Sequence, residues 1–175
     1  RGLGDVYKRQ HVSFAYPEAG ENVLTDISFK AKKGQTIAVI GSTGSGKSTL
    51  INLIPRYYDV TKGSVKVDGV DVRDMTQKEL RDKLGYVPQK GVLFSGTIDS
   101  NIRYGKPEIT DAQVKEAAEV AQATEFIDTK PEKYESPVSQ GGTNVSGGQK
   151  QRLSIARAIA KDPEIFIFDD SFSAL

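Results

Sequence analysis

The spacing of apolar side chains changes along the chain between the two-residue period of strands and the wider period of helices. Residues 23–30 alternate apolar and polar positions, which predicts a strand with one buried face. Residues 36–40 and 165–168 are continuous apolar or β-branched runs, and we expect both to be buried strands. Shorter strands are predicted at residues 63–69, between glycine turns, and at residues 85–89. The pattern therefore predicts an α/β core.

Helical patterns lie between these strands and dominate the middle of the chain. Apolar positions within residues 50–54 predict a helix directly after a glycine-rich loop. A threonine followed three residues later by Glu or Gln has the spacing of a capping box, which predicts helix starts at Thr76 and Thr110. With a further short helix expected over residues 97–104, we interpret residues 95–160 as a helical subdomain inserted into the core.

The patterns divide the chain into four segments. Residues 1–10 lack periodicity and contain a string, Asp5 to Gln10, that resembles translated adaptor sequence, so we predict a non-native leader and leave it out of the fold. Residues 11–94 form the first part of the core with its β portion, and residues 161–175 continue the core after the helical subdomain. Because the chain stops soon after an apolar strand, we expect it to be a fragment.

Composition excludes several classes of function. The 175 residues carry a formal net charge of +1, which gives no basic field of the kind that nucleic-acid binding requires. The absence of cysteine excludes disulfides, thiolate metal sites and thiol catalysis. No run approaches the ~20 apolar residues that span a bilayer. The one histidine, His11, has no metal-ligand neighbours in sequence and is expected on the surface.

A phosphate-binding motif follows the apolar run at residues 36–40. Residues 41–48 fit the pattern G-x-x-x-x-G-K-S, and the pattern stands between a predicted strand and a predicted helix, as it must. The glycines let backbone N–H groups wrap phosphate oxygens, Lys47 reaches the β- and γ-phosphates, and the Ser48 hydroxyl is a ligand for Mg²⁺. The predicted nucleotide-binding residues are Gly41, Ser42, Thr43, Gly44, Ser45, Gly46, Lys47, Ser48 and Thr49.

A second glycine-rich element, Ser146-Gly147-Gly148-Gln149, has the capping-box spacing and opens a predicted helix. The start of this helix offers unpaired backbone N–H groups and the positive end of a dipole worth roughly half a charge. The chain thus has two helix starts that are suited to binding phosphate, although one nucleotide needs only one phosphate-binding loop. This indicates that each chain supplies half of two composite sites in a dimer; an ordinary capped surface helix is the alternative.

Asp169 ends the apolar run at residues 165–168 and is the expected Walker B acid. A carboxylate there holds Mg²⁺, usually through water, because this ion gives up its hydration shell reluctantly. The alternative is a simpler role as the N-cap of a following helix.

Together these motifs resemble the nucleotide-binding domain of an ABC transporter of the exporter type, and they extend over residues 12–175. The resemblance implies a P-loop NTPase core with an antiparallel β subdomain and an inserted α-helical subdomain. Tyr16 takes the position of an aromatic that stacks on adenine, and Gln89 that of a glutamine near Mg²⁺ and the attacking water. A buried strand aromatic and a plain loop residue are their respective alternatives. Ser173 to Leu175 match the start of the D-loop.

The resemblance also implies the function. Such a domain binds ATP with Mg²⁺, and its sandwich dimer couples hydrolysis to export through a transmembrane domain. The expected partners are that transmembrane domain and a second nucleotide-binding domain, with no nucleic acid. The expected location is the cytoplasmic face of the cell membrane. The family's switch histidine is not among the 175 residues, so we expect this chain alone not to hydrolyse ATP normally.

The chain departs from the family pattern at Asp170, where efficient ATPases usually have the glutamate that acts as general base. The side chain is one methylene shorter, and a misplacement of about 1 Å can cost on the order of 10²-fold in rate. Because the signature at residues 146–149 is intact, we interpret the chain as the degenerate-site subunit of a heterodimer. The alternatives are a homodimer that uses Asp170 as base, a non-transport ABC-type ATPase, and a catalytically weak regulatory subunit.

Overall fold

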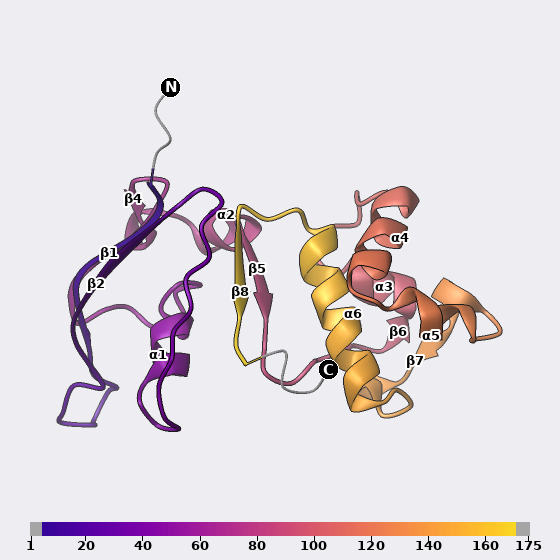
Figure 1. The fold of residues 1–175 in the computed structure, drawn as a ribbon, viewed down its shortest axis with the longest axis horizontal. Coiled ribbons are helices and arrows are strands. Elements are labelled where there is room, and N and C mark those ends of the chain that lie inside the picture. The colour runs from indigo at the N-terminus through magenta and orange to yellow at the C-terminus, as the bar shows by residue number, and fades with distance from the viewer. Residues whose placement is uncertain (1–4, 171–175) are drawn as a thin grey trace. The chain divides into compact units, whose positions relative to one another are not determined.

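The computed structural model describes residues 5–170, with side chains from Tyr7 onwards. The chain forms two compact units, residues 1–83 and 84–175, which are described separately here as the amino-terminal and carboxyl-terminal units (Figure 1). The predicted start of the D-loop at Ser173 to Leu175 lies outside the described residues.

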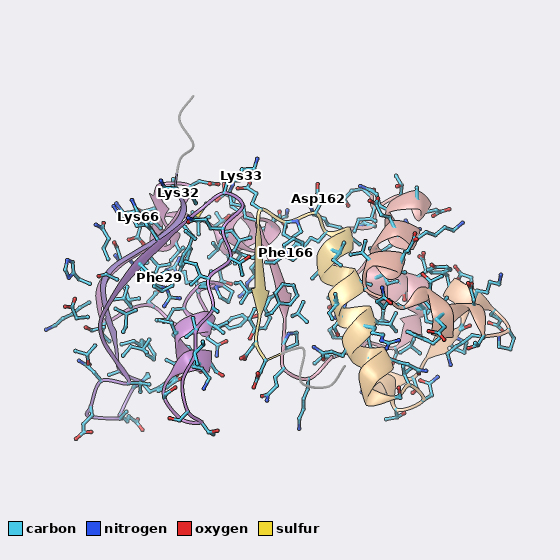
Figure 2. All side chains as sticks on the ribbon, in the orientation of Figure 1. Phe29, Lys32, Lys33, Lys66, Asp162 and Phe166 are labelled. Carbon is cyan, nitrogen blue, oxygen red and sulfur yellow. The ribbon has the colours of Figure 1, made fainter. Side chains whose placement is uncertain are left out.

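An antiparallel sheet forms the basis of the amino-terminal unit and confirms the predicted antiparallel β portion. Its order is β2-β1-β3-β4, and its strands are β1 (Asp5–Phe14), β2 (Leu24–Lys32), β3 (Lys62–Val67) and β4 (Val70–Asp71). Alternate side chains point to opposite faces, so Val65 and Val67 are buried while Lys66 between them is partly exposed. Figure 2 shows Lys32 and Lys66 at the same end of this sheet.

Leaving residues 5–10 out of the fold was wrong, because β1 begins at Asp5 and pairs with both β2 and β3. Tyr7 and Arg9 occupy its buried face, with 4% and 1% of their surface exposed. Two features hid the strand in the sequence: a charged residue takes an inward position, and the register shifts beyond Arg9, next to the positive φ of His11. The predicted non-native origin of residues 1–10 stays a prediction.

Two short helices and a 3₁₀ turn complete the amino-terminal unit: α1 (Lys47–Asn52), η1 (Val72–Asp74) and α2 (Gln77–Asp82). The capping box at Thr76 is confirmed, since its side chain accepts from the Glu79 N–H and the Glu79 carboxylate accepts from the Thr76 N–H. Helix α1 ends before the predicted limit at residue 54, because Pro55 disfavours helical backbone in the residue before it.

The prediction of a buried strand at residues 36–40 was also wrong. The segment has no regular secondary structure, and 43% of Ile37, 39% of Val39 and 93% of Ile40 are exposed. A strand exists only where its backbone groups pair with a neighbour. Among the described residues no strand pairs with this segment.

The carboxyl-terminal unit contains two small sheets. Parallel strands β5 (Leu84–Val87) and β8 (Ile165–Phe168) pair residue for residue, and β6 (Gly96–Thr97) pairs with β7 (Pro137–Val138) antiparallel. The predicted strand at 165–168 is confirmed, but the prediction that all of it is buried was wrong. Ile167 is buried, whereas Phe166 (Figure 2) and Phe168 are 44% and 37% exposed. Strand β5 is the one strand paired with β8 in the described chain, so β8 is covered incompletely.

Helices make up the rest of this unit and enclose its apolar core. They are α3 (Ile98–Ile102), α4 (Asp111–Val120), α5 (Thr124–Asp128), η2 (Lys133–Glu135), η3 (Gln140–Gly142) and α6 (Gly147–Ala160). Helix α6 packs on α3 and α4, and Ile102, Ala118 and Leu153 at this junction are fully buried. The helices fall within the predicted subdomain at 95–160, although its limits remain a prediction. No helix within residues 5–170 is both long and apolar enough to cross a membrane.

Candidate functional site

The glycine-rich loop at residues 41–46 owes its shape to the glycines. Gly44 and Gly46 have φ values of 81° and 91°, in the left-handed region that side chains with a Cβ rarely adopt. Gly46 is also the N-cap of α1, and a Cβ there would lie 3.1 Å from a methyl group of Leu24. The loop therefore requires glycine at this position both for its backbone conformation and for space.

Lys47, the first residue of α1, folds back over this loop. Its Nζ donates to the backbone carbonyl of Gly41 at 2.6 Å and to that of Ser42 at 2.8 Å. The loop is tight at the same point, since a Cβ on Gly41 would come within 2.5 Å of the Ser45 Oγ. The ammonium group thus lies beside the backbone that the motif uses to hold phosphate. Phosphate oxygens could replace these carbonyls as acceptors and form stronger, charge-assisted bonds.

Tyr16 lies next to the same helix. Its hydroxyl shares a hydrogen bond of 2.8 Å with the Thr49 Oγ1, and Thr49 is buried in α1. The ring follows the end of β1 and is partly exposed, so it is not the buried strand aromatic considered as the alternative. The structure therefore brings the predicted adenine-binding residue and the predicted phosphate loop together within one unit.

The predicted capping box at Ser146 is confirmed at the start of α6. The Ser146 Oγ accepts from the Gln149 N–H, and the Gln149 Oε1 accepts from the Ser146 N–H, both at 3.2 Å. Ser146 and Gly147 are exposed, and nothing lies within 4 Å of where a Cβ of Gly147 would be. The first turn of this 14-residue helix is consequently open to the approach of a large anion.

Gln89 and Asp169 follow the ends of the two parallel strands β5 and β8. The Asp169 N–H continues the ladder by donating to the Val87 carbonyl at 3.0 Å, and the Tyr86 hydroxyl reaches its carboxylate at 3.5 Å. Since parallel strands end at the same edge of a sheet, both residues lie at that edge. Asp170 follows with an exposed side chain and a φ of 49°.

The loop after Gln89 is bound tightly to α6, a link that the sequence analysis missed. The buried side chain of Gln151 donates to the Pro88 carbonyl at 3.1 Å. A Cβ on Gly91 would lie 2.6 Å from the Lys150 carbonyl, so only glycine allows this approach. The loop with Gln89 and the helix with the signature therefore form one connected element. The sequence shows only a glutamine at position 151, soon after the signature, and its burial is known from the structure alone.

A partly buried cation secures the far end of this loop. The Arg157 guanidinium donates to the Val92 carbonyl at 2.9 Å and to the Asn101 carbonyl at 2.7 Å, and it lies 5.2 Å from the centre of the Phe94 ring. Burial lowers the pKa of Arg157 to about 10. Its hydrogen bonds to carbonyls offset part of the cost of burying the charge.

The oxygen donors of the predicted metal site suit Mg²⁺. They comprise the hydroxyl of Ser48, the amide of Gln89 and the carboxylate of Asp169. Mg²⁺ prefers hard oxygen ligands and commonly keeps one or two protein ligands together with waters and phosphate oxygens. Within residues 5–170 no cluster of three or more His, Cys, Asp or Glu residues could hold a metal by itself. Ser48 belongs to the amino-terminal unit and Gln89 and Asp169 to the carboxyl-terminal unit, and oxygen donors of these kinds are ones that Mg²⁺ accepts.

Comparisons with known proteins show which proteins the chain resembles. The sequence profile of the family described as "ABC transporter" matches residues 24–173. The chain is 50% identical over 166 residues to a Bacillus subtilis protein named for multidrug export, the ATP-binding/permease protein YgaD; the match covers 95% of this chain and 29% of YgaD. It is 46% identical over 175 residues to SAB1799c of Staphylococcus aureus, named in the same way, covering 100% of this chain and 30% of that one.

A solved structure gives a similar result. The chain superimposes on a bacterial Atm1-family ABC exporter with ATP bound, with a TM-score of 0.92 and 39% sequence identity over 98% of this chain and 30% of that one. The chain thus spans about three tenths of the length of the proteins it matches.

Proposed function

We propose that this chain, which belongs to the ABC transporter family and is the ATP-binding domain of an exporter-type transporter, couples ATP binding and hydrolysis to export through a transmembrane domain. The proposal places it at the cytoplasmic face of the cell membrane. The names of the relatives, which combine an ATP-binding part with a permease, support transport over the action on nucleic acid that other ABC-type ATPases perform.

The observation that carries this proposal is the position of Lys47. Its ammonium group lies on the Gly41 and Ser42 carbonyls, inside a loop closed by glycines, and Tyr16 is bonded to the same helix through Thr49. A triphosphate in the loop would accept hydrogen bonds from Lys47 and from backbone N–H groups, while its base would stack on Tyr16. One unit thereby supplies groups for both ends of ATP.

The remaining residues have roles at the γ-phosphate. Mg²⁺, when bound, neutralises charge on the phosphate oxygens, and Ser48 and Asp169 would hold it. Gln89 would orient the attacking water, and Asp170 would accept its proton. The start of α6, with Ser146 and the two glycines, would bind the phosphates of an ATP held by a second nucleotide-binding domain.

Asp170 supports an asymmetric dimer. Its carboxylate is one methylene shorter than that of the usual glutamate, so it would lie too far from the water for fast hydrolysis. The signature has no matching defect, and the capping box that shapes it is complete. In the proposed heterodimer this chain's own site holds ATP and cycles slowly, while its signature completes the faster site of the partner. A homodimer that uses Asp170 as base is the competing arrangement.

A weakly catalytic regulatory subunit is the second candidate function, and Asp170 is the observation that favours it. The two candidates differ in what this chain's own site does. A slow enzyme is accelerated by restoring the glutamate, whereas a regulatory module without catalytic geometry is not.

The test uses the full-length transporter with its partner subunit, reconstituted in lipid vesicles, and measures turnover of the nucleotide occluded at each site. Asp170→Glu should raise turnover at this chain's site by on the order of tenfold or more. Lys47→Ala in the same chain should abolish nucleotide occlusion there and serves as the control for site assignment. Equal turnover at both wild-type sites would contradict the asymmetric dimer. Unchanged turnover in Asp170→Glu, with ATP still occluded, would favour the regulatory subunit.

A further inference from the structure

Three aromatic rings of the amino-terminal unit pack against one another, and the hydroxyl of one of them is hydrogen-bonded to α1. Phe14 ends β1, Tyr16 follows it, and Tyr58 comes six residues after the end of α1. The Tyr16 ring lies 4.9 Å from the Phe14 ring at an interplanar angle of 82° and 5.2 Å from the Tyr58 ring at 89°. Phe14 and Tyr58 also touch, at 5.6 Å between ring centres. The three rings, Phe14, Tyr16 and Tyr58, are called the aromatic trio below.

The trio fixes Tyr16 on two sides and leaves a stacking position available. Edge-to-face contacts at these distances are among the arrangements that aromatic rings prefer. Both neighbours meet Tyr16 nearly at right angles, so no aromatic ring of the described residues lies parallel against it. A planar base could therefore take the parallel position. Phe14 is buried, whereas Tyr58 is 42% exposed.

A third contact fixes the far end of the Tyr16 ring. Its hydroxyl is hydrogen-bonded to the Thr49 Oγ1 at 2.8 Å, and Thr49 is 7% exposed within α1. Helix α1 begins at Lys47, which lies over the phosphate loop. Tyr16 could not rotate about its side-chain bonds without breaking this bond and one of the edge contacts. The orientation of the ring is thus tied to the helix that positions Lys47.

We propose that Tyr58 and Thr49 are positioning residues for adenine recognition, holding the Tyr16 ring in the orientation in which a purine base stacks on it. Neither residue needs to touch the base for this role. The inference rests on the proposed function, since it assumes that Tyr16 binds the base of ATP. It goes beyond that function by identifying the residues that give Tyr16 its orientation.

The test compares two ligands that differ in the base, ATP and inorganic tripolyphosphate, each with Mg²⁺. Calorimetric titration of the 175-residue chain gives both dissociation constants, and their ratio isolates the contribution of the nucleoside. Tyr58→Ala should weaken ATP binding by about three- to tenfold, the equivalent of one aromatic pair, and leave tripolyphosphate binding unchanged. Tyr58→Phe retains the ring and should retain both affinities.

Several outcomes would overturn the inference. An equal loss of both affinities in Tyr58→Ala would mean that Tyr58 only supports the fold, and an unchanged ATP affinity would mean that it has no role. Both results leave the proposed function standing, provided that the wild-type chain binds ATP more tightly than tripolyphosphate. If the wild-type chain binds neither ligand, the proposed function itself fails.

A double-mutant cycle keeps the inference testable if Tyr58→Ala fails to fold. Tyr16→Phe removes the hydrogen bond and retains the aromatic ring. Thr49→Val removes the same bond and retains the volume of the side chain. Each should lower the affinity ratio of ATP to tripolyphosphate, and the double variant should lower it no further than either alone. Fully additive effects would show that the two hydroxyls act independently, and the proposed link to α1 would be rejected.

Discussion

At the scale of single residues, the most unusual feature is a buried cation in a strand. Arg9 is 1% exposed and faces the rings of Tyr7 and Phe29. The centre of each ring lies 5.5 Å from the guanidinium carbon of Arg9. Arg9 donates to the Tyr7 hydroxyl and to the Leu50 carbonyl, but none of the described side chains or backbone groups accepts a hydrogen bond from its Nη1. Burial raises the pKa of Tyr7 to about 12, with Arg9 acting in the opposite direction. A buried polar atom without a partner is costly, so this position is not optimised for stability.

We therefore predict that removing this polar pair stabilises the chain. The double variant Tyr7→Phe with Arg9→Met replaces both partners by apolar groups and should raise the free energy of unfolding by about 1–3 kcal/mol, the usual cost of an unsatisfied buried donor. Arg9→Met alone should gain less, because it also leaves the buried Tyr7 hydroxyl without its donor, whereas the Leu50 carbonyl loses its donor in both variants. Urea denaturation measures both. A lower free energy of unfolding in the double variant would contradict this interpretation of Arg9.

At the scale of elements, the capping boxes were predicted correctly from the local sequence. The boxes at Thr76, Thr110 and Ser146 all form as expected, because the interaction involves only residues three apart in sequence. A fourth box, at Thr97 with Ser100, lacks the usual Glu or Gln and was found only in the structure.

Strand burial was predicted less well, because it depends on neighbours distant in the chain. Residues 36–40 have the composition of a buried strand, yet the described structure gives them no pairing partner. The error at Arg9 was the reverse, because its charge made a strand that does form look unlike one in the sequence. For the candidate site, the sequence predicted the capping box at Ser146, whereas the contacts of Tyr16 with Tyr58 and of Gln151 with Pro88 connect residues too far apart to be predicted.

The start of α6 gives a prediction that separates folding from function. Ser146→Ala loses the cap and should lower the free energy of unfolding by about 1 kcal/mol, whereas Ser146→Asp retains an oxygen that caps the helix. In the full-length transporter, however, the carboxylate of Ser146→Asp should repel the triphosphate at the partner's site and strongly reduce ATPase activity.

The matched control is Thr110→Asp, which makes the same change at the capping box of α4, away from the proposed site. It should leave ATPase activity unchanged. If Ser146→Asp is as active as Thr110→Asp, the start of α6 does not face phosphate.

At the scale of the whole molecule, the site residues are divided between the two units. The amino-terminal unit contains Tyr16 and the phosphate loop, and the carboxyl-terminal unit contains Gln89, Asp169, Asp170 and the signature. In the proposed function, the first group would hold ATP, while the second would act at the γ-phosphate and on a partner's nucleotide. We therefore predict that nucleotide binding depends chiefly on the amino-terminal unit, and that hydrolysis requires both units and a second domain.

The most direct test of the central claim is a calorimetric titration of the 175-residue chain with Mg²⁺ and ATP. We expect saturable binding of one ATP per chain and a loss of at least about tenfold in affinity for Lys47→Ala, because a charge-assisted contact to phosphate is lost. Lys62→Ala, at an exposed lysine of β3, should bind like the wild type. No saturable binding by the wild type, or equal affinity in Lys47→Ala, would contradict the claim that this loop is the site for ATP.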